Sequence, residues 1–459
     1  MRKRVQQPIL KCQSYFLVGL TLSACGGKTI GLDQSLMQNG EGDTATGPSS
    51  TRYNEIIGND YDEVLFGSMG NDHIIAGFGD DQLHSKEGDD WLEGGNGNDM
   101  FYLSAGFHDI DGGSDSDTIV IDQSSSINFL NLNLSKGTLH FSNSEPAKVG
   151  HITSVENVQV LKNIDTVISI SGANSSVSTA GGDDTIYAFA DSITITTGRG
   201  DDAIFLKSSE GMLDGGSGTD LLLIDEGETA AVIVNLSEQK VIFINTLNKT
   251  MGVKNFENIT LNNTTDGNTV IGDVENNVIV GSANNDTLRG GLGDDTLTGG
   301  TGIDIFVYTA SDVGTSYTAI DTITDFEPGK YGDKFSLEAN NFITSNSATI
   351  QEIDLSLPAA ANVINGNSIL LITNGSGFSE KSEVLHALVS NASYSNPTNN
   401  EVALLAVWFN RSNDTVDVSV VTDIPSQDQS FDQINTFIEL AGKTETFIDE
   451  LTSDNFIIT

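Results

Sequence analysis

The chain has 459 residues, a formal net charge of −43 at pH 7 and 37% hydrophobic residues. Its 64 acidic and 21 basic residues exclude nucleic acid as a partner, because phosphate binding needs basic patches. Both cysteines fall within the first 25 residues, so the rest of the chain has no disulfide and needs another source of stability.

Residues 1–24 are predicted to be a signal peptide, because basic residues precede Tyr15–Leu22, an apolar run too short to span a bilayer. The sequence Leu22-Ser23-Ala24-Cys25 resembles a bacterial lipobox, which implies cleavage and lipidation at Cys25. An ordinary secretory peptide is the alternative. No Asp follows at the second mature position, and in lipoproteins this favours the outer membrane. Residues 25–57 are predicted to be a flexible tether.

Nonapeptides repeat without a gap from Gly58 to Val120, among them AGFGDDQLH and GGNGNDMFY. The fourth place favours Gly, the sixth Asp and the eighth an apolar residue. The first six residues are turn chemistry, and the last three form a short strand with one inward side chain. If two nonapeptides make one coil, acids eighteen residues apart lie about 4.8 Å apart on one edge. Such acids repel each other unless a cation lies between them.

The consensus GGxGxDx-apolar-x resembles the RTX, or hemolysin-type, calcium-binding repeat. The resemblance implies an all-β fold, a parallel β-roll or β-solenoid of nonapeptide repeats with irregular inserts, a C-terminal β-rich cap and multiple Ca²⁺ ions in the turns. Removal of residues 1–24 would change the net charge from −43 to −47, which a compact chain must neutralise. Turns that bind no metal are the alternative.

Three tracts are expected, at residues 58–120, 179–223 and 263–307. The predicted metal-binding acids are Asp72, Asp81, Asp90, Asp99, Asp117, Asp184, Asp202, Asp220, Asp286, Asp295 and Asp304. The weaker pairs Glu63/Asp81 and Asn277/Asp295 are also expected, while Asn268 and Asn277 indicate a capping region. The single histidines, His108 included, are expected to be solvated.

Residues 121–178 and 224–262 interrupt the repeats and are predicted to be β inserts, read as wider coils or small excursions of one solenoid. Each belongs to a duplicated module of about 100 residues that ends in Val155-Glu156-Asn157 or Phe256-Glu257-Asn258. Glu156 and Glu257 are expected to be structural rather than catalytic.

Residues 308–459 are predicted to form a β-rich cap. The segments around Asp321, Asp325 and Asp333 resemble the region that follows RTX repeats in secreted proteins, which implies these acids as possible further calcium ligands. The ending Leu451–Phe456 resembles that of type I secretion substrates. The export route is left open.

The sequence contains no HExxH, GxSxG or P-loop motif, and no catalytic residue is assigned. We therefore expect a calcium-binding outer-membrane, cell-surface or extracellular lipoprotein with a structural or adhesive role, its partners being calcium, a membrane through its lipid and a cell-surface polysaccharide or protein. One alternative is an enzyme acting on polysaccharides through Asp111, Asp214, Glu156 or Glu257. Another is a module whose C-terminal region binds a partner.

Overall fold

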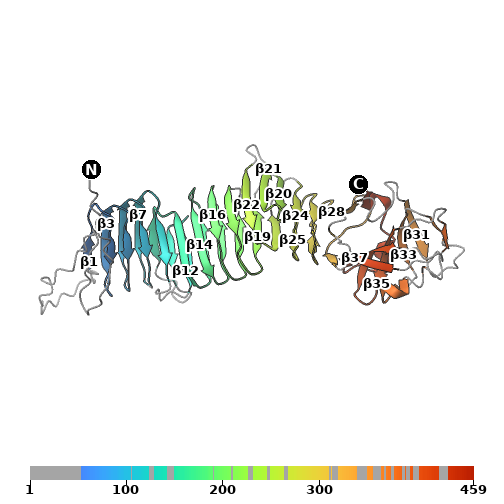
Figure 1. The fold of residues 1–459 in the computed structure, drawn as a ribbon, viewed down its shortest axis with the longest axis horizontal. Helices are drawn as coiled ribbons and strands as arrows, with labels where there is room; N and C mark the ends of the chain where they lie inside the picture. Colours follow the sequence, from blue (N-terminus) through green and yellow to red (C-terminus); the bar gives the residue numbers. More distant parts are fainter. Residues whose placement is uncertain are drawn as a thin grey trace, which may run out of the picture. The chain divides into compact units, whose positions relative to one another are not determined.

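The structure is a computed structural model, drawn in Figure 1. It describes residues 53–458 except residues 105, 123–128, 142–148, 190, 208–209, 226–230, 245–248, 263–266, 310–311, 313–318, 339–348, 355–362, 366–367, 374–376, 385–387, 389–392, 396–402 and 423–432. The predicted signal peptide, Cys25 and most of the tether lie outside the described residues. The chain divides into two compact units at Asp184/Thr185, inside the predicted second tract. The domain boundaries given above stay predictions.

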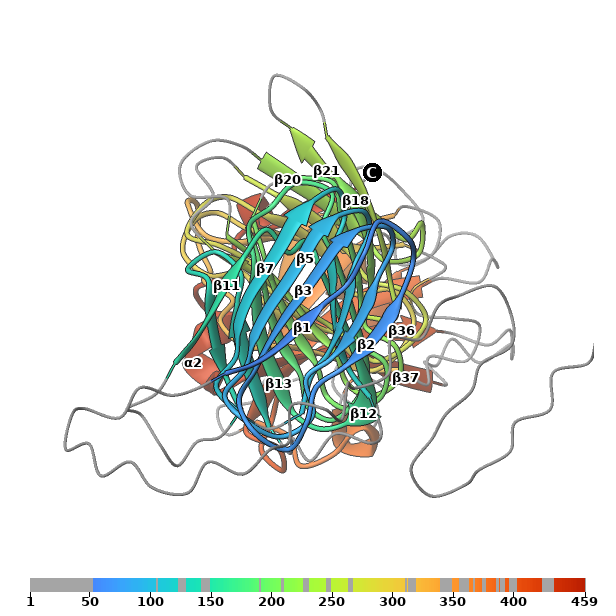
Figure 2. The same ribbon diagram turned by 90° about the vertical axis from the view of Figure 1, so that its left-hand side faces the viewer.

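The first unit is built of two sheets of stacked strands. One sheet contains β1 (Asn54–Ile57), β3 (Asp72–Phe78), β5 (Trp91–Asn96), β7 (Asp109–Ser114), β11 (Gly150–Thr153), β10 (Thr138–His140), β9 (Leu130–Asn133) and β13 (Thr166–Ile170). The other contains β2 (Val64–Phe66), β4 (Gln82–His84), β6 (Met100–Tyr102), β8 (Thr118–Ile121), β12 (Asn157–Asn163) and β14 (Ser176–Gly181). Figure 2 shows β1, β3, β5 and β7 following one another in one layer.

Two nonapeptides make one coil, as the repeat predicts. His73 pairs in parallel with Trp91 in one sheet, and Gln82 pairs with Met100 in the other. The eighth-place side chains point between the sheets and form the core: Ile74, Leu83, Leu92 and Phe101 are 0% exposed. A single short strand buries little, so the stack stabilises the coils.

An antiparallel meander of β9, β10 and β11 interrupts the first unit. It enters the sheet between β7 and β13, to which β11 and β9 pair in parallel. In the opposite sheet β12 pairs directly with β8, so Asn157 lies beside Thr118. The insert is thus a small excursion of the solenoid, and the coil resumes after it.

The second unit repeats this plan. One sheet contains β15 (Thr185–Ala188), β17 (Ala203–Leu206), β19 (Leu221–Asp225), β23 (Asn258–Asn262), β25 (Val278–Val280), β27 (Thr296–Thr298), β29 (Asp321–Ile323), β37 (Gln433–Ala441), β36 (Thr415–Thr422), β35 (Ala403–Asn410), β33 (Ser368–Thr373) and β31 (Thr349–Asp354). The other contains β16 (Ile193–Thr196), β18 (Gly211–Asp214), β22 (Thr250–Lys254), β21 (Lys240–Ile244), β20 (Ala231–Asn235), β24 (Thr269–Ile271), β26 (Thr287–Arg289), β28 (Ile305–Tyr308), β30 (Lys334–Leu337) and β38 (Phe456–Ile458). Here β20, β21 and β22 form the meander.

The C-terminal region extends the second unit with strands. β35, β36 and β37 are antiparallel neighbours, and β37 pairs in parallel with β29. Other described elements include the strand pair β32 (Val363–Asn365) and β34 (Ser393–Ser395), the helix α2 (Glu445–Ile448) and the 3-10 turn η3 (Ser453–Asn455). The all-β parallel solenoid predicted from the sequence is confirmed. Among the described residues, no helix has the length and apolar character needed to cross a membrane.

Candidate metal centre

Acidic side chains in the sixth place of the repeats stack along the edges of the coils. On one edge of the first unit, the backbone N–H of Asp81 donates to Asp99 Oδ1 at 2.8 Å, and that of Asp99 donates to Asp117 Oδ1 at 2.8 Å. Each carboxylate therefore uses one oxygen to hold the preceding coil. Glu63 joins the same series, since its N–H donates to Asp81 Oδ1 at 2.7 Å.

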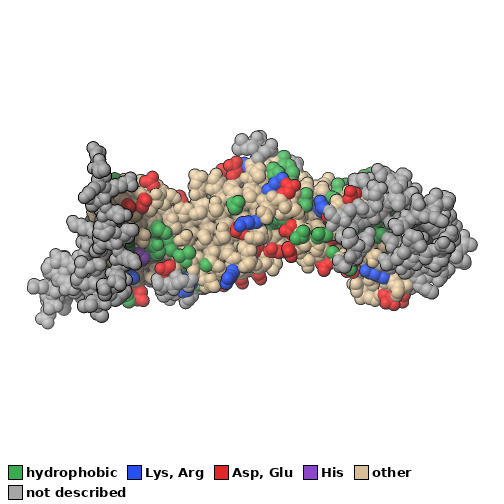
Figure 3. All heavy atoms as spheres, in the orientation of Figure 1, with side chains coloured by type: hydrophobic (Ala, Val, Ile, Leu, Met, Phe, Trp, Pro, Cys, Tyr) green, Lys and Arg blue, Asp and Glu red, His purple; other side chains and the backbone are tan. Residues whose placement is uncertain are grey.

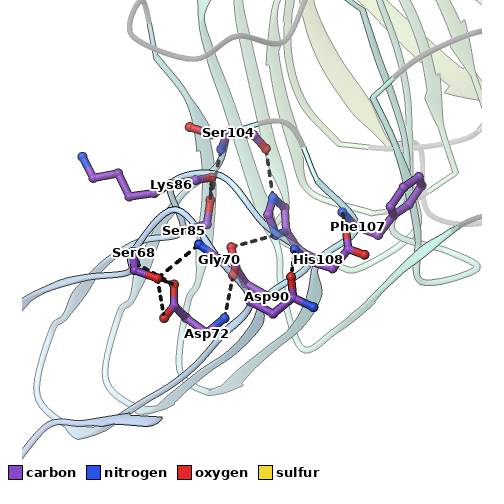
Figure 4. A network of polar contacts seen from close by, with 11 residues as sticks. Ser68, Gly70, Asp72, Ser85, Lys86, Asp90, Ser104, Phe107 and His108 are labelled. Carbon is purple, nitrogen blue, oxygen red and sulfur yellow. Dashed lines mark hydrogen bonds and ion pairs between the residues drawn. The ribbon is translucent and has the colours of Figure 1, made fainter. Parts of the chain in front are cut away.

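The opposite edge of the first unit, shown in Figure 4, carries Asp72, Asp90 and His108. The N–H of Asp72 donates to Asp90 Oδ1 at 2.9 Å. His108 takes the next sixth place, with Nδ1 3.3 Å from Asp90 Oδ2 and Nε2 2.9 Å from the carbonyl oxygen of Ser104. The expectation that His108 is solvated is wrong, because it is 0% exposed. A proton between Nδ1 and Oδ2 would satisfy both atoms.

The second unit has the same series on both edges. The N–H of Asp202 donates to Asp220 Oδ1 at 2.9 Å, and that of Asp286 donates to Asp304 Oδ1 at 2.8 Å. The N–H groups of Asn268 and Asn277 donate to Asp286 and Asp295. Asp184 closes the first unit, where its Oδ1 accepts the N–H of Thr166 at 2.8 Å. The predicted pair Asp184/Asp202 belongs to two units and stays a prediction.

Both series continue beyond the last repeat. The N–H of Asp295 donates to Asp321 Oδ1 at 3.0 Å, and that of Asp304 donates to Asp333 Oδ1 at 2.8 Å. Asp325 has another role, because it accepts the N–H groups of Gly299 and Gly300. Two of the three acids suggested for this segment thus take the sixth-place position.

Besides Asp90, whose Oδ2 faces His108, six sixth-place acids of the described chain have a buried second carboxylate oxygen without a hydrogen-bond partner. These are Asp81, Asp99, Asp117, Asp220, Asp295 and Asp304. Burial raises the pKa of Asp81 and Asp295 to about 6 and that of Asp117, Asp220 and Asp304 to about 7, with neighbouring acids adding to the effect. Burial also raises the pKa of Asp99. The surroundings of these six buried oxygens therefore favour a bound positive charge.

The turns that hold these six acids share a backbone shape. Their second place is glycine with positive φ, namely Gly77, Gly95, Gly113, Gly216, Gly291 and Gly300. In five of these turns the first place is also glycine, which lets the carboxylate and a backbone oxygen approach the same point, whereas the turn of Asp81 has Ala76 there. A Cβ at Gly94 would collide with Asp99 Oδ2 and lie 2.6 Å from the carbonyl oxygen of Gly112. The space is therefore bounded by a carboxylate oxygen and a backbone oxygen, which are ligands that Ca²⁺ prefers.

The family model described as the RTX calcium-binding nonapeptide repeat (4 copies) matches residues 57–92, 79–107 and 271–306. The chain contains RTX calcium-binding repeats. A search among curated proteins found no match. The matched residues include most of the first tract and the Asn277–Asp304 part of the third.

The RTX turns of this chain fit calcium through few side chains and several backbone oxygens. The described residues contain no group of three or more His, Cys, Asp or Glu side chains that could hold a metal. The fit therefore rests on one or two carboxylates, the buried unpartnered oxygens and the glycine-lined space beside them. Calcium there would supply the positive charge and oxygen coordination that these groups lack.

The turns of Asp72 and Asp286 are closed by their own backbone, as are those of Glu63 and Asn277. The N–H of Ser68 donates to Asp72 Oδ2 at 2.6 Å, as Figure 4 shows, and the N–H of Ser282 donates to Asp286 Oδ2 at 2.6 Å. Neither serine has positive φ. The repeat pattern predicts Asp72 and Asp286 as metal-binding acids and does not distinguish closed turns from open ones. These two turns have serine in the second place, whereas Lys86 in the second place of the Asp90 turn has φ +64°.

Substitution Ser68→Gly is expected to add one bound calcium ion per chain. It creates the sequence Gly67-Gly-Met-Gly-Asn-Asp72, which matches the full consensus and allows the positive φ seen in the open turns. Ser68→Ala is the control, because it removes the hydroxyl and keeps the backbone preference. Equilibrium dialysis measures the ion count. Equal counts for both variants would show that the second place does not select the open turn.

The fifth place forms a second ladder that the sequence analysis missed. The N–H of Asn98 donates to Asp80 Oδ1 at 2.7 Å, and the N–H of Ser116 donates to Asn98 Oδ1 at 3.0 Å. Here the earlier coil supplies the acceptor, which reverses the direction of the sixth-place series. The signal was present as Asp or Asn in the fifth place of most repeats.

The four acids proposed for an enzyme do not gain support from their contacts. Glu156 and Glu257 accept the backbone N–H groups of Asp117 and Asp220. Asp214 is paired with Lys254 Nζ at 2.7 Å. Asp111 is exposed on β7. Three of the four therefore already have structural partners.

Proposed function

We propose that the protein is an exported calcium-binding β-roll lipoprotein, anchored at the bacterial outer membrane through Cys25, with a structural or adhesive role. The observation that carries the calcium-binding part is the set of buried, unpartnered carboxylate oxygens in glycine-lined turns. Folding would be driven by calcium, because these acids repel one another in its absence. Extracellular calcium modules bind at roughly 10⁻⁴–10⁻³ M, so the chain would fold outside the cell and stay open inside.

An adhesive role is supported by rings stacked on the outer surface of the first unit. Phe66 stacks on His84 at 4.6 Å between centroids, and His84 stacks on Tyr102 at 4.3 Å. Phe66 is 53% exposed. On the face drawn in Figure 3, hydrophobic and histidine side chains lie near one another. A row of rings offers a surface for a sugar or an apolar protein patch.

The anchor is tested by expressing the full chain in a bacterial host that has an outer membrane. The wild-type protein is expected in the outer-membrane fraction and labelled by radioactive fatty acid. The variant Cys25→Ala is expected to be unlabelled and soluble, with its calcium binding unchanged. Added protease then shows whether the wild-type protein faces the outside of intact cells. An unlabelled wild-type protein would contradict the anchor and leave the calcium sites untouched.

A further inference from the structure

The repeat tract before each meander ends on a sixth-place acid. No further nonapeptide follows that acid until the meander has ended. Asp117 and Asp220 are each 0% exposed, and in each the Oδ2 atom has no hydrogen-bond partner. The residue eighteen positions later lies in the insert and belongs to no nonapeptide. Both acids also lie outside the segments that match the repeat family.

A glutamate closes the series in the first unit. The N–H of Asp117 donates to Glu156 Oε2 at 3.0 Å across 39 residues of sequence. The N–H of Asn157 donates back to the carbonyl oxygen of Asp117 at 3.0 Å, and β12 pairs with β8 from this point. Glu156 therefore stands in register with Asp117, in the position that Asp99 and Asp117 hold in the preceding coils.

The same close approach of a carboxylate oxygen and a backbone oxygen is present beside Asp117. A Cβ at Gly112 would lie 2.5 Å from Asp117 Oδ2 and would collide with the carbonyl oxygen of Ser154. Ser154 has φ +54°, and Val155 behind it is buried. A carboxylate oxygen and a backbone oxygen thus bound the space beside Gly112, as they do beside Gly94.

The second unit contains an independent copy of this arrangement. The N–H of Asp220 donates to Glu257 Oε2 at 2.8 Å across 37 residues. A Cβ at Gly215 would lie 2.8 Å from Asp220 Oδ2 and would collide with the carbonyl oxygen of Asn255, which has φ +57°. The same acid, glycine, left-handed residue and glutamate recur where the second meander leaves the coil.

We infer that Asp117 with Glu156, and Asp220 with Glu257, form two further calcium sites at the junctions between repeat and insert. This inference rests on the proposed calcium binding of the repeats and extends it to coils that carry no repeat sequence. The glutamate supplies the second charge that the missing sixth-place Asp would supply, and the left-handed residue two positions earlier turns its carbonyl oxygen toward the site. Calcium would therefore hold each insert to the coil before it.

The test is the number of calcium ions bound by the full mature chain. Glu156→Gln keeps an oxygen acceptor for the N–H of Asp117 and removes the charge, so it is expected to bind one ion fewer than the wild type. Glu257→Gln is expected to lose one ion and the double variant two, measured by equilibrium dialysis and by calorimetric titration. Glu87→Gln, which changes an exposed turn residue, is the matched control and keeps the wild-type count.

The outcomes separate this inference from the proposed function. A wild type that binds calcium, with an unchanged count in both Gln variants, would overturn the inference alone. A wild type that binds none would overturn both. If a glutamate serves only as a hydrogen-bond acceptor, Glu156→Ala will lower the urea midpoint in calcium while Glu156→Gln keeps both midpoint and ion count. The Glu257 variants provide the same comparison where a Glu156 variant fails to fold.

Discussion

Chelation of calcium at pH 7.5 is expected to unfold part of the repeat coils of the full mature chain and to destabilise the rest, and acidification in the chelator is expected to restore part of the β structure. Without a cation, the buried carboxylates of Asp99, Asp117 and their neighbours must stay charged at close range. An uncompensated buried charge costs on the order of several kcal/mol. Several such groups offset much of the roughly 5–15 kcal/mol that typically stabilises a domain.

The direction of the pH effect follows from the raised pKa values. Burial raises the pKa of Asp81 to about 6 and that of Asp117 to about 7 in the folded chain, from an ordinary value of 3.8. The folded state therefore binds protons more tightly than the unfolded state. This contribution to stability is complete below pH 3.8 and is lost as the pH rises through 6 to 7.

Far-ultraviolet circular dichroism during urea unfolding checks both parts. In excess chelator, the midpoint should be higher at pH 5 than at pH 7.5. In saturating calcium, the midpoint at pH 7.5 should exceed the chelated one, because calcium replaces the proton. Magnesium is the control ion, since its octahedral preference and reluctant dehydration suit these turns poorly. A β spectrum that survives chelator unchanged at pH 7.5 would contradict the account.

Asp99→Asn is expected to change stability in opposite directions with and without calcium. Asp99 lies between Asp81 and Asp117, so its negative charge repels the carboxylates on both sides. The Asn side chain keeps an oxygen for the N–H of Asp81 and removes the charge. In chelator, the loss of repulsion should raise the urea midpoint. In calcium, the loss of a ligand should destabilise the fold by about 1–3 kcal/mol and remove one or two bound ions.

A matched control is available one residue earlier. Asn98 is exposed in the fifth place and accepts the N–H of Ser116, so Asn98→Ala should lower stability equally in both conditions by about 1 kcal/mol. Only substitution of a buried sixth-place acid should change the stability in opposite directions with and without calcium. If Asp99→Asn lowered the midpoint in chelator as well, repulsion between the stacked acids would not be the reason for calcium dependence.

Periodicity explains why so much of the fold could be predicted. A nine-residue repeat with one apolar residue per short strand has one way to bury that residue, and Ile74, Leu83 and Phe101 lie in the core as expected. The eighteen-residue spacing also follows from two strands per coil. It brings Asp72 beside Asp90 and Asp202 beside Asp220.

The contacts that could not be predicted depend on features that do not recur periodically in the sequence. Glu156 meets Asp117 only because an antiparallel meander brings the chain back after 39 residues, and no spacing rule predicts that offset. The role of His108 depends on complete burial beside Asp90, which a single histidine does not indicate. The closed turn at Ser68 depends on where one N–H points, and this follows from backbone φ rather than from the acid column.

The sixth-place series gives the solenoid a polarity, because every donor belongs to an earlier coil and every acceptor to a later one. In the second unit the series ends on Asp321 and Asp333, and Asn455 Nδ2 donates to the carbonyl oxygen of Asp333 at 2.7 Å. A chain that emerged C-terminus first would offer each arriving coil a finished template. A chain that emerged N-terminus first would instead expose the donors of its newest coil until the next coil arrived, so the order of emergence decides whether the growing end presents acceptors or donors.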